Sequence, residues 1–94
     1  MKTNKLPPLD QILKALADPV RLCATKQLLL DKEKEMACGT FDYDVSKATF
    51  SHHIKILVDA QILSERIEGT RKFLSINKNT RQAYPELFQI ILKD

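Results

Sequence analysis

One face of a predicted helix in the middle of the chain carries hydroxyl, imidazole and ammonium groups. The helix spans Ser46–Asp59, and serine is a residue type that caps helix N-termini well. At about 100° per residue, its outward face and flanks are formed by Ala48, Thr49, Ser51, His52 and Lys55. Groups of this kind hydrogen-bond to the base edges and phosphates of DNA. A face that serves only solubility more often pairs Glu with Lys at i, i+4. The pattern predicts a helix that reads a DNA major groove.

The side chains of this face are predicted to divide between bases and phosphates. Hydroxyl and imidazole groups suit base edges and adjacent phosphates, a role that we expect of Thr49, Ser51 and His52. Ammonium groups suit phosphates, and we expect Lys47 and Lys55 to anchor there. For Thr49 an alternative stays open, in which it only supports the first turn of the helix.

The inward face of the same helix is apolar. Phe50, Ile54 and Leu57 recur at i, i+4 and i+7, which predicts burial. His53 lies nearer this edge, so a partly buried structural role competes with DNA contact. A metal site at His52 and His53 is not expected, because residues i and i+1 point about 100° apart and the chain has no other histidine.

A β-hairpin with a basic far strand is predicted after this helix. Glu68–Thr70 forms its turn, in which Gly69 is free to adopt a positive φ. Its first strand is expected to pack through Ile62, Leu63 and Ile67. The cations at its tip are Arg66, Arg71 and Lys72. They would contact phosphates or enter a narrow minor groove; the alternative is an ordinary charged hairpin whose cations prevent edge-to-edge association.

The remaining helices flank this unit. Apolar residues at helical spacing predict a first helix over 9–16, and Asp18-Pro19 predicts the start of a second that runs to about Leu30. Residues 36–41 contain Gly39 and predict only one short helical turn, followed by a loop over 42–45. Residues 1–8 form a polar tail and residues 80–94 a last helix. That helix is apolar beyond one stripe, because Ile90 and Leu92 lie off it, so the first and last helices are expected to form a homodimer.

Composition limits the class of protein. The 94 residues suit a single domain, and the net charge of +3 is compatible with a nucleic-acid partner. We expect no membrane span and no secretory signal, since no apolar run is long enough for either. Two cysteines indicate reduced thiols and a cytoplasmic protein. No phosphate loop or Ser-His-Asp order is present, so neither an enzyme nor a cofactor is expected.

Three segments resemble ArsR-type winged helix-turn-helix regulators of bacteria. They are Ala15–Leu22 (ALADPVRL), Ser46–Leu57 (SKATFSHHIKIL) and Leu63–Phe73. The resemblance implies a mostly helical fold with a hairpin wing, dimerisation through the first and last helices, and a repressor that a signal releases from DNA. Two departures stand out. Relatives have a longer helix over 36–41, and they have Gly where this chain has Gln61, so the end of the DNA-reading helix is expected to differ.

Cys38 is an open question of function. In arsenic- and cadmium-sensing relatives a pair of cysteines near this position binds a thiophilic ion, whereas this segment holds one thiol, and Cys23 is distant in sequence. The family's other metal site uses acids and histidines of the last helix, which here has no histidine. Metal sensing is therefore not expected. A thiol switch at Cys38, alone or with Cys23, remains an alternative to buried, inert cysteines.

The sequence as a whole predicts a homodimeric transcriptional regulator that binds double-stranded DNA at an inverted repeat. Two competing hypotheses keep the fold. One is a protein-interaction module, and the other is a constitutive DNA-binding protein without an inducer. The sequence does not identify the inducer.

Overall fold

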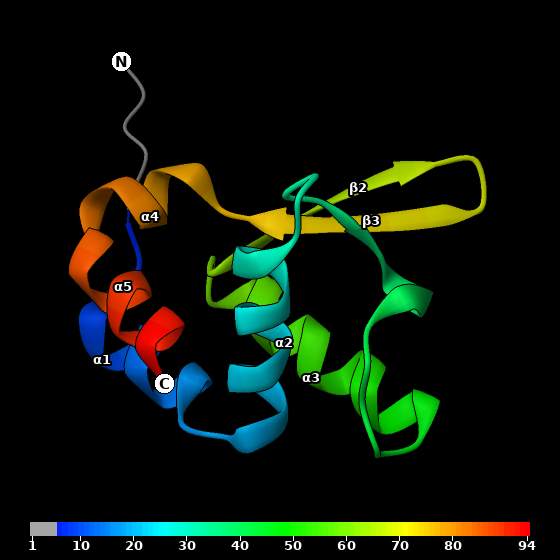
Figure 1. Cartoon of the computed structure of the whole chain (residues 1–94), viewed down its shortest axis with the longest axis horizontal. Helices are drawn as coiled ribbons and strands as arrows, with labels where there is room; N and C mark the ends of the chain where they lie inside the picture. The colour runs from blue at the N-terminus through cyan, green and yellow to red at the C-terminus, as the bar shows by residue number, and fades with distance from the viewer. Residues whose placement is uncertain (1–5) are drawn as a thin grey trace.

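The computed structural model describes residues 6–94, which form five α-helices and a three-stranded antiparallel sheet. The helices are α1 (Leu9–Leu16), α2 (Pro19–Leu30), α3 (Lys47–Asp59), α4 (Lys78–Ala83) and α5 (Pro85–Lys93). The strands are β1 (Met36–Ala37), β2 (Leu63–Glu68) and β3 (Arg71–Ile76), and one 3-10 turn, η1 (Cys38–Thr40), follows β1. The β2–β3 hairpin projects from one end of the molecule, while α1, α4 and α5 gather at the other (Figure 1). The predicted mostly helical fold with a hairpin wing is confirmed.

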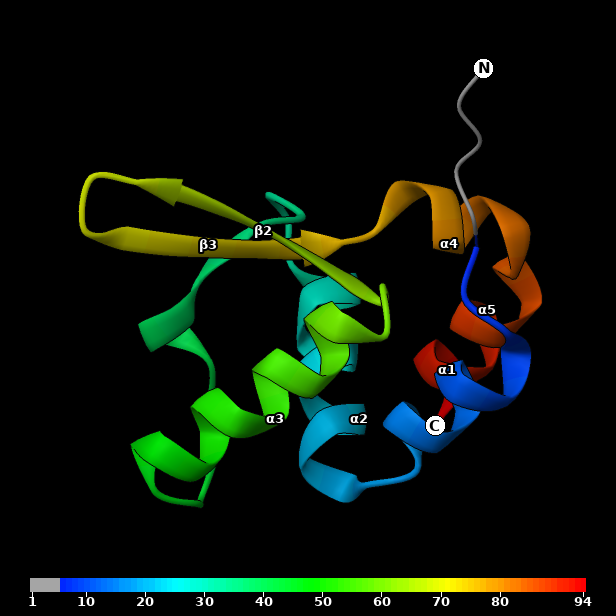
Figure 2. The same cartoon turned by 180° about the vertical axis from the view of Figure 1, so that it is seen from behind.

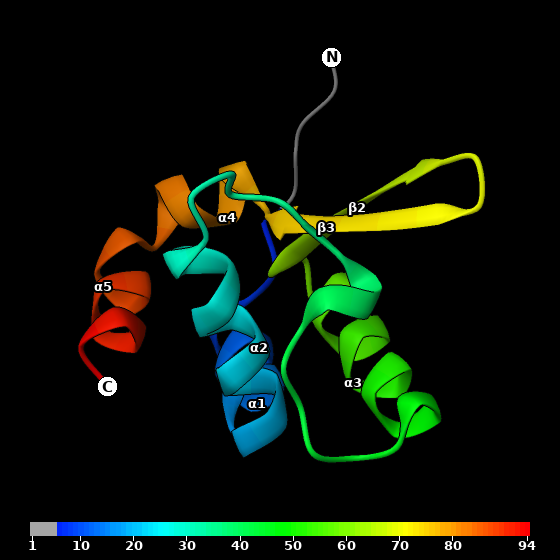
Figure 3. The same cartoon turned by 45° about the vertical axis from the view of Figure 1, so that its right-hand side comes forward.

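Helix α2 lies at the centre of the packing. It contacts α1, α3, α5 and β3, and the view in Figure 3 shows it between α5 and α3. The predicted start of α2 is confirmed, because Asp18 Oδ1 accepts from the amides of Val20 (2.8 Å) and Arg21 (3.2 Å) and Pro19 occupies the first helical position. The most deeply buried apolar side chains around it are Ile12, Leu28, Leu57, Ile62, Leu63, Leu74 and Phe88.

Helix α3 has the amphipathic form that its sequence predicts. Phe50, Ile54 and Leu57 are buried, with at most 3% of their surface exposed. Ser46 caps the helix, and its Oγ accepts from the amide of Thr49 at 3.1 Å. Burial of the inward face therefore fixes which residues of α3 face solvent.

The C-terminal end of α3 contradicts the prediction that Gln61 changes it. Gln61 adopts the left-handed conformation (φ 62°), as glycine does in this position. The amide of Gln61 donates to the Val58 carbonyl at 2.9 Å, and the amide of Ile62 donates to the Leu57 carbonyl at 3.0 Å. These two bonds define a Schellman ending, and the burial of both Leu57 and Ile62 holds the glutamine in a backbone conformation that its side chain disfavours.

The sheet has the strand order β1-β3-β2, and β1 is an element that the sequence analysis did not predict. The hairpin register pairs Glu68 with Arg71, so the turn has two residues and Gly69 adopts φ 64°, as predicted. Leu74 is fully buried at the base of the hairpin. Ile67, which was predicted to pack, is instead 67% exposed, because the hairpin extends beyond the core before this residue.

The segment between α2 and α3 contains the predicted single helical turn, as a 3-10 turn, and the predicted loop. The loop is held by two contacts. Gln27 of α2 donates to the carbonyl of Asp42 (2.8 Å) and accepts from its amide (2.9 Å). Tyr43 stacks on Phe50 of α3 with ring centroids 3.9 Å apart, and Phe41 lies 5.5 Å from the same ring. Side chains thus supply the support that a longer helix would otherwise give.

The C-terminal segment differs from the single helix predicted over 80–94. Asn77 caps the short helix α4, whose chain then turns at Tyr84 before Pro85 begins α5. The buried Thr80 hydroxyl donates to the carbonyl of Gln61 at 2.7 Å, which ties α4 to the end of α3. Of the predicted N-terminal tail, residues 1–5 lie outside the described part, and Pro7 is buried. No helix within residues 6–94 is both long and apolar enough to span a membrane.

Replacing Gln61 by glycine is expected to stabilise the domain by about 1 kcal/mol, because glycine adopts positive φ without the steric cost of a side chain. In a domain of this size the Tm should rise by about 4–8 °C in thermal unfolding followed by circular dichroism. Gln61→Ala keeps the left-handed cost and serves as the control. Equal Tm values for the two variants would contradict this source of strain.

The carboxyl group of Asp18 makes the free energy of unfolding depend on pH under acidic conditions. Burial favours its protonated form, but the amides of Arg21 and Val20, the charge of Arg21 and, when its ring is protonated, the charge of His53 outweigh this, so the pKa of Asp18 lies below its usual value. A lowered pKa gives stabilisation that is present above the unfolded-state pKa of about 3.9 and is lost as pH falls through the folded-state pKa.

Asp18→Ala should therefore lower the free energy of unfolding by about 1 kcal/mol at neutral pH in urea titrations. Asp18→Asn retains a good cap but cannot titrate, so its stability should fall less than that of the native chain on acidification below about pH 4. Identical acid profiles for the native chain and Asp18→Asn would exclude this role for the carboxylate.

Candidate nucleic-acid interface

The outward face of α3 is open to solvent along its length. Every residue predicted to lie there is exposed, namely Lys47, Ala48, Thr49, Ser51, His52 and Lys55. Figure 2 shows α3 and the β2–β3 hairpin extending toward the same side of the molecule, with the segment before α3 between them. A helix and a wing on one side can engage a groove and its flanking backbone together.

A hollow of about 470 Å³ lies between the N-terminal half of α3 and the wing. Its charged lining residues are Lys47 of α3 with Arg71 and Lys72 of β3, and no carboxylate lines it. Thr40, Tyr43, Ser51 and Thr70 add hydroxyl groups. Three cations and four hydroxyl-bearing residues form a surface suited to the sugar–phosphate backbone of a nucleic acid.

A second hollow, of about 330 Å³, continues along α3 toward its C-terminal end. Here the cations have carboxylate partners: Lys55 Nζ lies 3.4 Å from Asp59, and Lys72 Nζ lies 3.4 Å from Glu65. These exposed pairs contribute little to stability and can exchange a carboxylate for a phosphate. The net positive part of the interface is therefore its half nearer the start of α3 and the wing tip.

Arg66 and Arg71 have different surroundings, although both were predicted as DNA contacts. The Arg66 guanidinium donates to both oxygens of Glu35 (2.9 and 3.0 Å) and to Glu68 (2.9 Å), and it lies over the Phe73 ring at 4.5 Å. The hydrogen bonds that Arg66 donates to Glu35 and Glu68 raise the pKa of Arg66, and Arg66 in turn lowers the pKa of Glu35. Arg66 thus clamps the wing to the segment before β1. The Arg71 guanidinium also lies over the Phe73 ring, 5.0 Å from its centroid, and Arg71 lines the hollow of about 470 Å³.

Thr49 takes part in the helix cap, the alternative that the sequence left open. Its hydroxyl receives a hydrogen bond from Ser46 Oγ at 2.9 Å, and its amide donates to the same oxygen. The threonine is exposed as well, so its second lone pair and its methyl group still face outwards.

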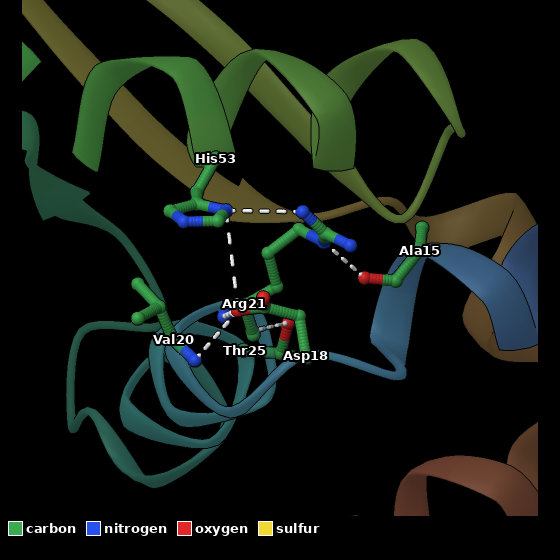
Figure 4. A network of polar contacts seen from close by, with 6 residues as sticks. All are labelled: Ala15, Asp18, Val20, Arg21, Thr25 and His53. Atoms are coloured by element: carbon green, nitrogen blue, oxygen red, sulfur yellow. Dashed lines mark hydrogen bonds and ion pairs between the residues drawn. The ribbon is translucent and has the colours of Figure 1, made fainter. Parts of the chain in front are cut away.

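His53 occupies the structural position that the sequence left open. Its side chain is 15% exposed, and its Nδ1 lies 3.0 Å from Arg21 Nη1 and 3.9 Å from Asp18 Oδ1 (Figure 4). The neighbouring His52 is exposed and its ring centroid lies 6.3 Å away. The two histidines therefore face different surroundings, one inside and one toward solvent.

The two cysteines lie at different places in the fold. Cys23 is exposed on α2, where its Sγ accepts from Gln27 at 3.4 Å, so the expectation that it is buried is wrong. Cys38 is half-buried and lines both hollows between α3 and the wing. Within residues 6–94, no group of three or more His, Cys, Asp or Glu side chains is placed to hold a metal ion.

Three residues that support this interface from outside it were not predicted from the sequence. Glu35 stands in a run of alternating acidic and basic residues (31–35), which is typical of a solvated turn, yet it fixes Arg66. Gln27 and Arg21 act through long-range contacts with Asp42 and His53. Their signal in sequence was weak, because a polar residue on a helix ordinarily faces solvent.

Comparison with known proteins identifies the family. No family model matches the chain. The chain is similar to the transcriptional repressor SdpR of Bacillus subtilis (strain 168), with 32% identity over 76 residues that cover 79% of this chain and 81% of that protein. It is also similar to the arsenical resistance operon repressor of the same organism, with 31% identity over 77 residues that cover 81% of this chain and 72% of that repressor.

Solved structures agree in fold. An ArsR family transcriptional regulator matches with a TM-score of 0.71 at 23% identity, over 86% of this chain and 88% of that one. The homodimeric winged helix-turn-helix DNA-binding domain of a Mycobacterium bovis protein matches with a TM-score of 0.63 at 25% identity, over 90% of this chain and 81% of that one. By its identity to the two repressors and by this fold, the chain belongs to the ArsR family of winged helix-turn-helix transcriptional regulators, which are not enzymes.

Proposed function

We propose that this protein is a homodimeric repressor that binds an inverted-repeat operator in double-stranded DNA. The observation that carries the proposal is the hollow between α3 and the wing, which is lined by Lys47, Arg71 and Lys72 and by no carboxylate, although Lys72 also pairs with Glu65 beside it. In this arrangement α3 enters the major groove while the wing cations contact phosphates beside it. Ser51 and His52, both exposed on α3, are the proposed base-edge contacts.

The dimer is proposed from the apolar surface at the other end of the molecule. Leu9 and Leu13 of α1 are 46% and 47% exposed, and Ile90 of α5 is 63% exposed. Both helices pack on α2 through their opposite sides, so a second copy of the chain can cover these residues. The similarity to a homodimeric DNA-binding domain supports this mode of assembly. Two-fold symmetry then places two copies of α3 in successive major grooves, about one helical turn apart.

Repression implies release by a signal. A signal acts when it favours a dimer geometry in which the two α3 helices no longer match the half-site spacing, a coupling that is typically 1–3 kcal/mol. Such a protein works where the chromosome is, so we place it in the cytoplasm. The identity to two repressors supports this direction of regulation.

The proposal is tested by fluorescence anisotropy with the DNA just upstream of this protein's own gene, against a scrambled duplex of equal length. At physiological salt with reductant present, we expect the upstream DNA to bind about 10³-fold more tightly and with two protomers per duplex. Equal weak binding to both duplexes would leave only non-specific DNA binding. No binding at low salt would favour a protein-interaction module instead.

Substitutions at the interface should separate specificity from phosphate contact. His52→Ala is expected to reduce the difference in binding free energy between the operator and the scrambled duplex by about 1–3 kcal/mol, because it removes a base-edge contact. Arg71→Ala should weaken binding to both duplexes and reduce the slope of log K against log salt by about one. Arg81→Ala, at an exposed arginine of α4, is the matched control and should change neither quantity. A loss at Arg71 that is confined to one operator base pair would contradict its phosphate role.

A further inference from the structure

The side chain of Arg21 connects three helices. It belongs to α2, its Nε donates to the carbonyl of Ala15 in the last turn of α1, and its Nη1 lies 3.0 Å from Nδ1 of His53 on α3 (Figure 4). The backbone of Arg21 is fixed as well, because its amide donates to the Asp18 cap and its carbonyl accepts from the Thr25 hydroxyl. One guanidinium therefore links the proposed dimer helix α1 to the proposed DNA-reading helix α3.

This contact requires one particular tautomer of the His53 imidazole. A guanidinium has only donors and stays charged, so the imidazole must accept at Nδ1 and carry its proton on Nε2. The other charged group facing His53 from α2 is Asp18, whose Oδ1 lies 3.9 Å from Nδ1 and already accepts two backbone amides. On its own helix the neighbouring titratable group is His52, and α1 contributes the neutral carbonyl of Ala15 through Arg21.

Protonation of His53 at Nδ1 would remove the acceptor and place two cations about 3.0 Å apart. Arg21 would then leave the imidazole, or the ring would turn toward Asp18. Either movement breaks the guanidinium link between α3 and the end of α1. In a dimer each α3 must match its half-site. A small rotation of α3 relative to α1 therefore worsens the fit of the protein to both half-sites of the operator.

We propose that Arg21 and His53 are positioning residues, which fix the orientation of α3 relative to α1 for operator binding only while the His53 imidazole is neutral. The inference rests on the proposed function and extends it to two residues outside the DNA surface. It also predicts a pH dependence of DNA binding that is opposite to the usual one. Acidification makes a protein more positive and ordinarily strengthens DNA binding, whereas here it weakens specific binding.

The test measures operator and scrambled-duplex affinity between about pH 8 and about pH 5.5 at constant ionic strength, a range in which histidine titrates. The native chain should lose about tenfold in operator affinity as pH falls, the order of a typical coupling, while binding to the scrambled duplex holds or rises. His53→Asn places an amide oxygen where Nδ1 lies and cannot titrate. This variant should keep the operator affinity of the native chain at high pH and lose the decline at low pH.

Two further variants complete the design. His52→Asn removes the imidazole at the adjacent exposed position; because His52 is itself a proposed base-edge contact, its operator affinity should be lower at every pH, but the further loss on acidification should remain. Arg21→Met keeps the side-chain stem without its donors, and it should lower operator affinity about tenfold with little change for the scrambled duplex. Arg81→Met, on exposed α4, controls for the loss of one charge. Circular dichroism at each pH establishes that every variant remains folded.

The outcomes separate the two proposals. If the native chain does not prefer the operator at high pH, the proposed function fails. If it prefers the operator but the native chain and His53→Asn have the same pH profile, the positioning role of Arg21 and His53 is overturned.

Discussion

The burial of one face of α3 against the rest of the domain is the constraint on which the candidate interface depends. Phe50, Ile54 and Leu57 are removed from water, and transfer of such side chains contributes about 1.5–3 kcal/mol each. That energy fixes the rotation of the helix about its own axis. The polar residues of the opposite face have no comparable interactions within the domain, so they present their functional groups outward as a consequence of the packing beneath them.

The wing obtains its direction from a different kind of interaction. Beyond Leu74 the hairpin leaves the core, and an isolated two-stranded hairpin is marginal in water. Arg66 compensates by joining Glu35, Glu68 and the Phe73 ring, so that one side chain connects both strands with the segment before β1. A cation that looks available for DNA in the sequence is thus mostly engaged in holding the wing in place, which leaves the neighbouring Arg71 freer to face a ligand.

Sequence reasoning located those parts of the fold that short-range patterns determine. The cap at Asp18, the faces of α3 and the turn at Gly69 each follow from a few adjacent residues. It failed where burial in the folded domain or a partner distant in sequence decides. Gln61 keeps a left-handed backbone because Leu57 and Ile62 are buried on either side of it, and Lys78–Ala83 forms a helix that Thr80 anchors to that same glutamine's carbonyl. The candidate site divides in the same way, since Ser51, His52 and Lys55 were found from periodicity, whereas Glu35 and Arg21 act over separations of more than 30 residues.

The hydrogen bonds between Gln27 and Asp42 determine which positions around the loop before α3 tolerate amino-acid substitution. Both bonds reach the backbone of Asp42, and neither uses its side chain. Substitution at position 42 by any residue other than proline therefore leaves both bonds available, whereas position 27 requires a side chain with both a donor and an acceptor at that reach. The loop ahead of α3 can accordingly diverge in sequence, and acquire new contacts with a ligand or partner, while a single glutamine on α2 preserves its path. Evolutionary freedom in the loop and constraint on the helix are two results of the same pair of bonds.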